Sequence, residues 1–348
     1  MKLRIILLTL VITLFLSLNI INISGEYSLP NTVKIGLSYG DSAVNNFNIK
    51  SPYGILIQDS DGNIVVSENS PNGFTFSIAD SYNIQICDPE TGEVKHTVNA
   101  EKDILIKPNE VNIGIIKYLE YKNKKYRGTL ALRRLSDKNI TIVNDVNFEE
   151  YLYGVVPSES PSSWPMEALK AQAVAARNFA ALNIGKHSKY GFDLCDTQDC
   201  QVYKGLSQET DATNQAVNQT GNKMIYYNDK PINAFYHSSS GGHTENSENI
   251  FSSPLPYITG VEDQFSLGNK NDNWIKSFDK EYIKNKMIYS KLDVGDILDI
   301  IPIETSEFGR VIKVEIRGTK SSEILQKEKI RFVLGSTDLK SIWYNLRT

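Results

Sequence analysis

A single glutamate, Glu159, stands in the segment "YGVVPSESPSSWP" between a short apolar run and a stretch of Pro and Ser. Val155, Val156 and Trp164 near it are apolar, and a carboxylic acid among apolar groups tends to keep its proton. A general acid that works at neutral pH needs a protonated carboxyl, so Glu159 is a candidate catalytic acid. The competing interpretation is structural, because a carboxylate ahead of a helix is also stabilised by the helix macrodipole.

The segment that follows Glu159 has the pattern of a helix. In "WPMEALKAQAVAARNFAAL" apolar residues recur every three to four positions, which predicts a helix from Trp164 onward. Ser163 is available as the N-cap, and Pro165 would lie in the first turn, where its missing N–H has no cost. The alanines of this segment leave room for close backbone packing, so we expect the helix in the core.

Strand patterns dominate the rest of the chain. Runs rich in β-branched and aromatic residues, separated by turn signals, predict a β-rich region at residues 30–120. Its strands are expected in "NTVKIGLSY", "YGILIQD", "GNIVVSE", "GFTFSIA" and "YNIQICD". The runs "KYRGTLALRRL" and "NITIVNDV" predict a hairpin that leads toward Glu159.

The segments beyond the central helix are mixed. A second helix is expected in "ETDATNQAVNQT", a pair of strands in "KMIYYNDKPINAF", and closing strands in "RVIKVEIRG" and "KIRFVLGS". This order favours an α+β fold with a β-rich region at 30–120 and a second domain at 121–348.

The N-terminus has the pattern of an export signal. Lys2 and Arg4 precede an uncharged apolar run from Ile5 to Ile21. Residues 1–25 are therefore expected to be a signal peptide or a membrane anchor, with the rest of the chain outside the cytoplasm. The 37 basic and 41 acidic residues are spread without long blocks, which argues against nucleic acid as a partner.

Two cysteines, Cys195 and Cys200, lie close together in "CDTQDC". In an exported chain such a pair predicts a disulfide. The third cysteine, Cys87, lies in a predicted strand and is expected to be a buried thiol.

Four motifs follow one another along the chain: "FEEYLYGVVPSE", "EALKAQAVAARNFA", "CDTQDCQVYKG" and "AFYHSSSGGHTENSENIF". In this order they resemble the bacterial stage II sporulation protein D family, also called the SpoIID/LytB family. The resemblance is strongest from about Tyr126 to Phe251. It implies that residues 121–348 form a catalytic domain, because the sporulation members are membrane-anchored lytic transglycosylases that cut peptidoglycan glycan strands. Other relatives are described as enhancers of a partner amidase.

The resemblance places the catalytic acid at Glu159, although Ser160 and Pro161 stand where the family usually has Met-Pro. It also makes Arg177 a candidate catalytic residue, whose guanidinium would orient Glu159 or a substrate carboxylate through paired N–H donors. A structural ion pair is the alternative role for Arg177.

Sugar-binding residues are implied at Gln172 and in the loop that begins "YHSSSGG". The loop residues are Tyr236, His237, Ser238, Ser239 and Ser240. Hydroxyl groups and a flexible backbone suit the wall of a sugar-binding groove, although an ordinary turn has the same composition.

Some members of the family hold zinc through one His and two Cys, which would correspond to His187, Cys195 and Cys200. Three such ligands and a water complete a tetrahedral site. Asp199 stands where a His is common in relatives. Zinc and the disulfide therefore both stay open, and no other cofactor is expected.

The number of carboxylates separates two reactions. A hydrolytic glycosidase normally uses two, whereas a lytic transglycosylase manages with one, because the muramic acid 6-hydroxyl attacks internally. Glu159 alone suits the second reaction. The glutamates that could supply a second carboxylate for hydrolysis are Glu149, Glu150, Glu245 and Glu248. The non-catalytic alternatives are a wall-binding enhancer of an amidase and an exported structural protein.

Overall fold

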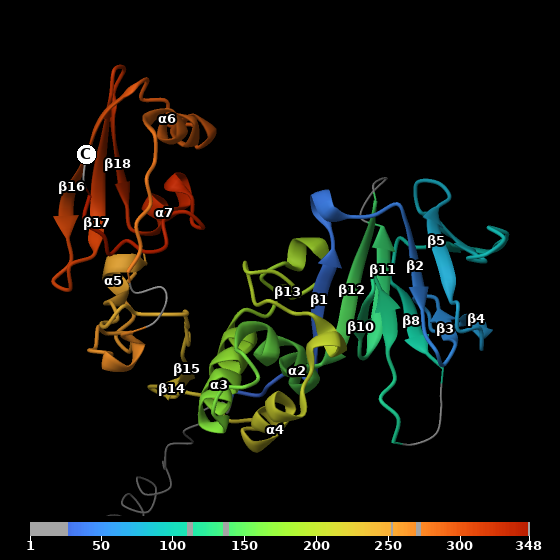
Figure 1. Ribbon diagram of the computed structural model, residues 1–348. Coiled ribbons are helices and arrows are strands. Elements are labelled where there is room, and N and C mark those ends of the chain that lie inside the picture. Colours follow the sequence, from blue (N-terminus) through green and yellow to red (C-terminus); the bar gives the residue numbers. More distant parts are fainter. Residues whose placement is uncertain (1–26, 110–113, 135–138, 252, 269–272, 347–348) are drawn as a thin grey trace, which may run out of the picture. The chain divides into compact units, whose positions relative to one another are not determined.

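The computed structural model describes residues 27–109, 114–134, 139–251, 253–268 and 273–346 (Figure 1). They form two compact units that divide between Phe235 and Tyr236, and each unit is described by itself. The signal or anchor predicted at residues 1–25 lies outside the described residues. Within the described ranges, no helix is both long enough and apolar enough to cross a membrane. The arrangement of strands and helices is α+β, as predicted.

The first unit contains two large sheets. The strands of the larger sheet are β1 (Thr32–Ser38), β3 (Ile55–Gln58), β4 (Ile64–Glu68), β8 (Ile104–Pro108), β11 (Thr129–Arg134), β12 (Ile140–Asn147) and β13 (Leu194–Cys195). Those of the smaller sheet are β2 (Asn46–Lys50), β5 (Phe74–Ile78), β6 (Asn83–Cys87), β7 (Val94–Asn99), β9 (Leu119–Tyr121) and β10 (Lys124–Tyr126). Their orders are β13-β1-β12-β11-β8-β3-β4 and β10-β9-β2-β5-β6-β7.

Alternating apolar residues explain why these segments form strands. In β2, Phe47 and Ile49 are buried while their neighbours are exposed, and the same alternation runs through β3 and β8. Apolar side chains of both sheets meet in one core. The predicted β-rich region is confirmed, and so is the hairpin of β11 and β12, in which Thr129 lies opposite Asp145.

The predicted domain boundary near residue 120 falls inside these sheets. β8 precedes it and β11 follows it, yet the two strands pair directly, with Leu105 opposite Ala131. β1 likewise pairs with β12, with Ile35 opposite Asn144. The early strands and the segment that leads to Glu159 therefore share one unit, because strands distant in sequence pair in one sheet.

Glu159 is the last residue of a helix, whereas the sequence analysis placed it ahead of one. This helix, α2 (Phe148–Glu159), begins at Asn147, whose side chain accepts hydrogen bonds from two backbone N–H groups of the first turn. Gly154 and Pro157 disfavour a helix, and they are the reason for the wrong prediction. Burial of the apolar face of α2 outweighs that preference, since most helical stability comes from packing.

The long central helix, α3 (Met166–Leu182), was predicted and is confirmed. It begins two residues later than expected, with Pro165 rather than Ser163 as its N-cap. The reason is a turn in front of it, closed by a hydrogen bond of 3.0 Å from the N–H of Trp164 to the carbonyl of Pro161. Its small buried residues pack the helix closely into the unit, as its alanine content predicted.

Two smaller predictions in the first unit are also confirmed. The second helix is α4 (Asp211–Gln219), which packs against α3. The strand pair is β14 (Tyr226–Tyr227) with β15 (Lys230–Pro231). Asn228 and Asp229 join these strands with φ of 49° and 59°, the left-handed conformation that a tight hairpin turn needs.

The second unit is built on a three-stranded sheet. Its elements are α5 (Ser247–Ile250), α6 (Lys280–Tyr289), β16 (Ile297–Thr305), β17 (Val311–Gly318), β18 (Ser322–Gln326) and α7 (Glu328–Leu334). The predicted strand in "RVIKVEIRG" is β17, at the centre of the sheet. The strand predicted in "KIRFVLGS" is wrong, because α7 covers most of it. Ile330, Val333 and Leu334 are buried at helical spacing while Phe332 points to solvent.

Candidate functional site around Glu159

Glu159 is held at the C-terminal end of α2 by a backbone donor. Its Oε1 accepts a hydrogen bond of 2.7 Å from the N–H of Val202. The side chain is half-buried, and it takes part in none of the ion pairs among the described residues. The C-terminal end of a helix is the negative end of the macrodipole, so the structural role expected at a helix N-terminus is wrong for this carboxyl.

The loop that carries Val202 is tightly folded. The N–H of Cys200 donates to the carbonyl of Thr197 at 3.0 Å, and the N–H of Tyr203 donates to the carbonyl of Asp196 at 3.2 Å. Tyr203 is buried, and its hydroxyl donates to Asn144 Oδ1 in β12 at 2.8 Å. The donor that meets Glu159 is therefore fixed to the larger sheet.

Four potential metal ligands gather at the start of this loop. The side-chain donor atoms of His187, Cys195, Asp199 and Cys200 all lie within 4.8 Å of one another. His187 Nε2 is 3.2 Å from Asp199 Oδ2 and 3.4 Å from Cys200 Sγ. The three residues named from the family resemblance are thus brought together, and Asp199 supplies a fourth donor where the sequence analysis expected water.

The donor set of this cluster fits zinc. Two sulfurs, one imidazole nitrogen and one carboxylate oxygen are all zinc ligands, and four protein ligands are typical of a closed, structural site. The hydrogen bond between the two thiols lowers the pKa of Cys195 and raises that of Cys200, so in the metal-free cluster Cys195 is the thiolate and Cys200 the donor. Both cysteines are free thiols here, so the disulfide stays a prediction. Cys87 is a buried free thiol, as predicted.

Arg177 binds Glu149 and not Glu159. Its Nε and Nη2 donate to the two carboxylate oxygens of Glu149, each at 2.7 Å, and the Arg177 side chain is fully buried. The guanidinium also donates to the carbonyls of Lys223 and Val217 at 3.2 and 3.4 Å. The carboxylate that Arg177 holds is thus that of Glu149 and not that of Glu159, and this ion pair ties α3 to the first turn of α2. The expected role toward a substrate carboxylate stays a prediction.

The other two glutamates of α2 are engaged elsewhere. Glu149 is bound by Arg177, and Glu150 lies 3.3 Å from Arg127. Of these three glutamates on α2, Glu159 alone has no ion pair with a described residue.

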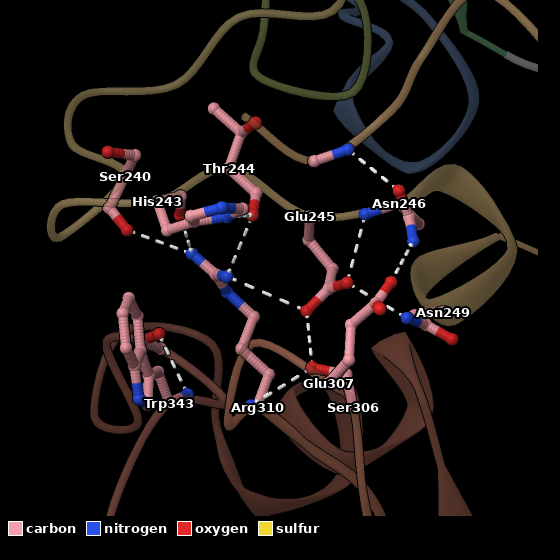
Figure 2. Close-up of polar contacts among 12 residues, drawn as sticks. Ser240, His243, Thr244, Glu245, Asn246, Asn249, Ser306, Glu307, Arg310 and Trp343 are labelled. Carbon is pink, nitrogen blue, oxygen red and sulfur yellow. Dashed lines mark hydrogen bonds and ion pairs between the residues drawn. The ribbon is translucent and has the colours of Figure 1, made fainter. Parts of the chain in front are cut away.

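Glu245 belongs to the second unit and is held in a polar network (Figure 2). Its Oε2 accepts from Ser306 Oγ at 2.6 Å and faces Arg310 Nη1 at 3.6 Å. Its Oε1 accepts from the N–H of Asn246 at 2.9 Å and from Asn249 Nδ2 at 2.8 Å. Both oxygens are used to join the loop before α5 to the turn between β16 and β17, so Glu245 is a structural residue.

The same network includes one predicted sugar-binding residue. Ser240 is buried, its carbonyl accepts from Arg310 Nη2 at 2.8 Å, and its hydroxyl binds Asp263 Oδ2 and Ser266 Oγ at 2.8 and 2.6 Å. The Ser240 hydroxyl is thus engaged inside the second unit, and its contact with sugar stays a prediction. Glu248, the last candidate for a second carboxylate, is exposed on α5.

The other predicted sugar-binding residues are divided between the units. Gln172 lies on α3 in the first unit, and its amide nitrogen is buried without a partner among the described residues. Tyr236, His237, Ser238 and Ser239 open the second unit, where His237 and Ser238 are exposed. Their contact with sugar stays a prediction.

The exposure of Trp164 and the burial of Asp196 were not predicted from the sequence. Trp164 exposes 48% of its surface on the turn between α2 and α3, five residues after Glu159. Its exposure is unusual for tryptophan but leaves no trace in a single sequence. Asp196 lies in the loop of Val202, and burial raises its pKa to about 6. Its long-range packing could not be predicted.

A serine nucleophile is not supported by the structure. The segment "GLSYG", residues 36–40, matches the Gly-x-Ser-x-Gly pattern. Ser38 is fully buried in β1, however, and its hydroxyl lies 2.8 Å from the hydroxyl of Tyr121. A substrate has no access to that hydroxyl.

Comparison with known families agrees with this site. Residues 136–227 match the SpoIID family model, described as stage II sporulation protein. This segment of the chain belongs to the SpoIID family. The SpoIID segment contains Glu159, Arg177 and the whole cluster from His187 to Cys200.

Three relatives are similar to part of this chain. An uncharacterised protein of Brachyspira hyodysenteriae is 41% identical over 138 residues, which are 39% of this chain and 37% of that protein. A Bacillus subtilis protein named amidase enhancer is 39% identical over 137 residues, which are 39% of this chain and 18% of the relative. The stage II sporulation protein D of Bacillus subtilis is 36% identical over 178 residues, which are 47% of this chain and 52% of that protein. The similarity thus covers about half of these relatives' lengths or less.

Proposed function

We propose that the protein cleaves the glycan strands of peptidoglycan as a lytic transglycosylase, with Glu159 as general acid and then general base. The observation that supports this most is the isolation of Glu159, since arginines engage both other glutamates of α2. Membership of the SpoIID family supports a role in the cell wall. A single carboxyl suffices only when the substrate supplies its own nucleophile.

The proposed reaction uses one carboxyl twice. Glu159 gives its proton to the glycosidic oxygen as the bond from that oxygen to C1 of muramic acid breaks. The 6-hydroxyl oxygen of the same sugar then bonds to C1, and its proton passes to Glu159, which restores the acid. No water is consumed. Because Oε1 is bound by the N–H of Val202, we expect Oε2 to carry the proton.

We also propose that His187, Cys195, Asp199 and Cys200 hold one zinc ion, which when bound would supply a structural cross-link. The loop that follows the cluster would then position the backbone N–H of Val202, because Val202 follows Cys200 by only two residues in a hydrogen-bonded loop. Fixing the two cysteines would therefore fix the N–H that orients Glu159.

The proposed setting is the outside of the cell, with residues 1–25 as signal or anchor and peptidoglycan as the main partner. A cell-wall amidase is a proposed second partner, by similarity to the relative named amidase enhancer. That similarity is also what supports the alternative function, a non-catalytic wall-binding enhancer.

Product analysis of purified glycan strands tests the proposed reaction. Incubation with the protein should release fragments that end in 1,6-anhydromuramic acid, detected by mass spectrometry. Ends that carry an added water would mean hydrolysis, and Asp196 would become the candidate second carboxylate. Intact strands, together with a raised rate of an added amidase, would support the enhancer instead.

Metal content is expected to depend on the four-residue cluster. The intact protein should hold one zinc per chain, His187→Ala should lose it, and Asp199→Asn should bind it more weakly, because each removes one of four ligands. Elemental analysis and competition with a chelator measure this. The control is Cys87→Ser, which alters the buried cysteine outside the cluster and should leave the zinc in place. A metal-free protein lighter by two hydrogens would establish the disulfide instead.

Trp164 is expected to support a sugar ring beside Glu159. Trp164→Ala should raise KM about fivefold to tenfold with little change in kcat, since about 1 kcal/mol of apolar burial is lost. Trp164→Phe should retain most of the binding. The control is Leu182→Ala, which removes an exposed apolar side chain at the end of α3 and should leave KM unchanged. Steady-state kinetics on soluble glycan fragments measure the effect. An unchanged KM in Trp164→Ala would remove this residue from the site.

A further inference from the structure

The first unit has a hollow on one face of its larger sheet. It has a volume of about 410 Å³, which lies in the range of small-ligand sites. Leu105, Ala131 and Val143 form its aliphatic floor, one from each of β8, β11 and β12. Their strand neighbours, such as Ile106 and Leu132, point to the opposite face and fill the core.

Charged groups of both signs surround this floor. Arg133 is neutralised locally, because its Nε donates to Asp103 Oδ1 at 2.6 Å. Lys34 and Lys102 also line the hollow, and neither forms an ion pair with a described carboxylate. The hollow therefore presents two ammonium groups without an ion pair to a described residue, and one of them, Lys34, lies opposite Asp145 in the strand pairing.

Asp145 adds an unused acceptor to the same hollow. Its Oδ1 is buried and accepts no hydrogen bond from any described residue. Asp145 lies opposite Lys34 in the pairing of β12 with β1, so the acceptor and one ammonium are neighbours on the same face of the sheet. Buried polar atoms normally have partners, and one without a partner at a hollow points to a ligand.

The three features together define the ligand. It must bring a carboxylate for Lys34 and Lys102, an N–H donor or ammonium for Asp145, and small aliphatic groups for the floor. A glycan of neutral sugars lacks the charge, and a simple phosphate polymer lacks the N–H donor. Muramic acid without its peptide offers a carboxylate and an amide N–H, but no ammonium group for the buried carboxylate of Asp145. A short peptide with a free amino terminus, a small first side chain and an acidic residue has all three.

We propose that this hollow binds short acidic peptides released from the cell wall by amide hydrolysis. The free amino terminus exists only after such hydrolysis, so the reaction that supplies the ligand is that of an amidase. The choice of the cell wall as the source of the peptide rests on the proposed function. The chemical class of the ligand rests on the residues of the hollow alone. The hollow would therefore be occupied only where peptides have been removed from the nearby glycan.

Calorimetry with a defined probe tests the proposal. The probe is L-alanyl-γ-D-glutamyl-L-lysine, compared with its N-acetylated form, on the intact protein. We expect the free peptide to bind and N-acetylation to weaken it by about tenfold or more, since a charge-assisted hydrogen bond to Asp145 is lost. Asp145→Asn should weaken the free peptide similarly and leave the acetylated form nearly unchanged. Lys34→Gln should weaken both forms.

The controls separate this proposal from the others. Lys50→Gln changes a surface lysine outside the hollow, paired with Glu120 at 3.2 Å, and should bind as the intact protein does. Circular dichroism shows whether each variant is folded. Equal binding of the two peptide forms, absence of binding at millimolar peptide, or preferred binding of glycerol phosphate would overturn the proposal. Glu159→Gln should still bind the peptide, so failure of the cleavage reaction and failure of this site are distinguishable.

Discussion

Glu159→Gln is expected to abolish glycan cleavage and to leave the protein folded. The amide has the shape of the acid but cannot donate and then recover a proton, and general acid–base catalysis contributes about 10²–10⁴-fold to a rate. The amide oxygen can still accept from the N–H of Val202, so the loop keeps its anchor. The release of 1,6-anhydromuramic ends by equal amounts of the two proteins is the measurement.

A matched control lies just beyond the turn that follows α2. Glu167 is exposed in the first turn of α3 and pairs only with Lys170 at 2.5 Å among the described ion pairs. Glu167→Gln makes the same chemical change there and should leave the rate unchanged. If Glu159→Gln kept more than about a hundredth of the activity, the carboxyl would have a supporting role at most. An unfolded Glu159→Gln protein would mean that this carboxyl serves the fold.

Glu149→Ala is expected to destabilise the first unit by about 3–5 kcal/mol, because it leaves the buried guanidinium of Arg177 without its carboxylate. The Arg177 side chain is fully buried, so the loss of its carboxylate partner leaves a buried charge with only backbone carbonyls as acceptors. Urea unfolding of the intact chain, followed by far-UV circular dichroism, measures the change.

The neighbouring Glu150→Ala is the control for this experiment. Glu150 lies in the same first turn of α2, so the loss of its interaction with the macrodipole is equal. Its partner Arg127 keeps a second carboxylate, since Arg127 Nε donates to Glu209 Oε1 at 2.6 Å. We expect this variant to lose about 1 kcal/mol or less. Equal losses in the two variants would contradict the structural role of Arg177.

Local patterns explain which parts of the fold could be predicted. The alternation in β2 and the three-to-four spacing in α3 are visible within a few residues, and both predictions are confirmed. α2 and α7 were missed because their helical state depends on burial against distant strands. Gly154 and Pro157 in α2 and the β-branched residues of α7 favour other conformations locally.

For the candidate site too, some features could be predicted from the sequence and others could not. The order of the motifs indicated Glu159 as the acid and His187, Cys195 and Cys200 as metal ligands. The donor atoms of these three ligands lie close together in the structure. The partner of Arg177 could not be predicted, because it lies on another helix, twenty-eight residues away in sequence. The hydrogen bond from the N–H of Val202 to Glu159 could not be predicted either, since every residue except proline has a backbone N–H.

The position of β12 has a practical consequence for recombinant work. This strand lies between β1 and β11, and neither neighbour belongs to the segment that matches the family. A fragment limited to residues 136–227 would expose both edges of β12 and invite intermolecular strand pairing. The limits of sequence similarity are therefore not the limits of cooperative folding, and a soluble fragment has to start before Thr32.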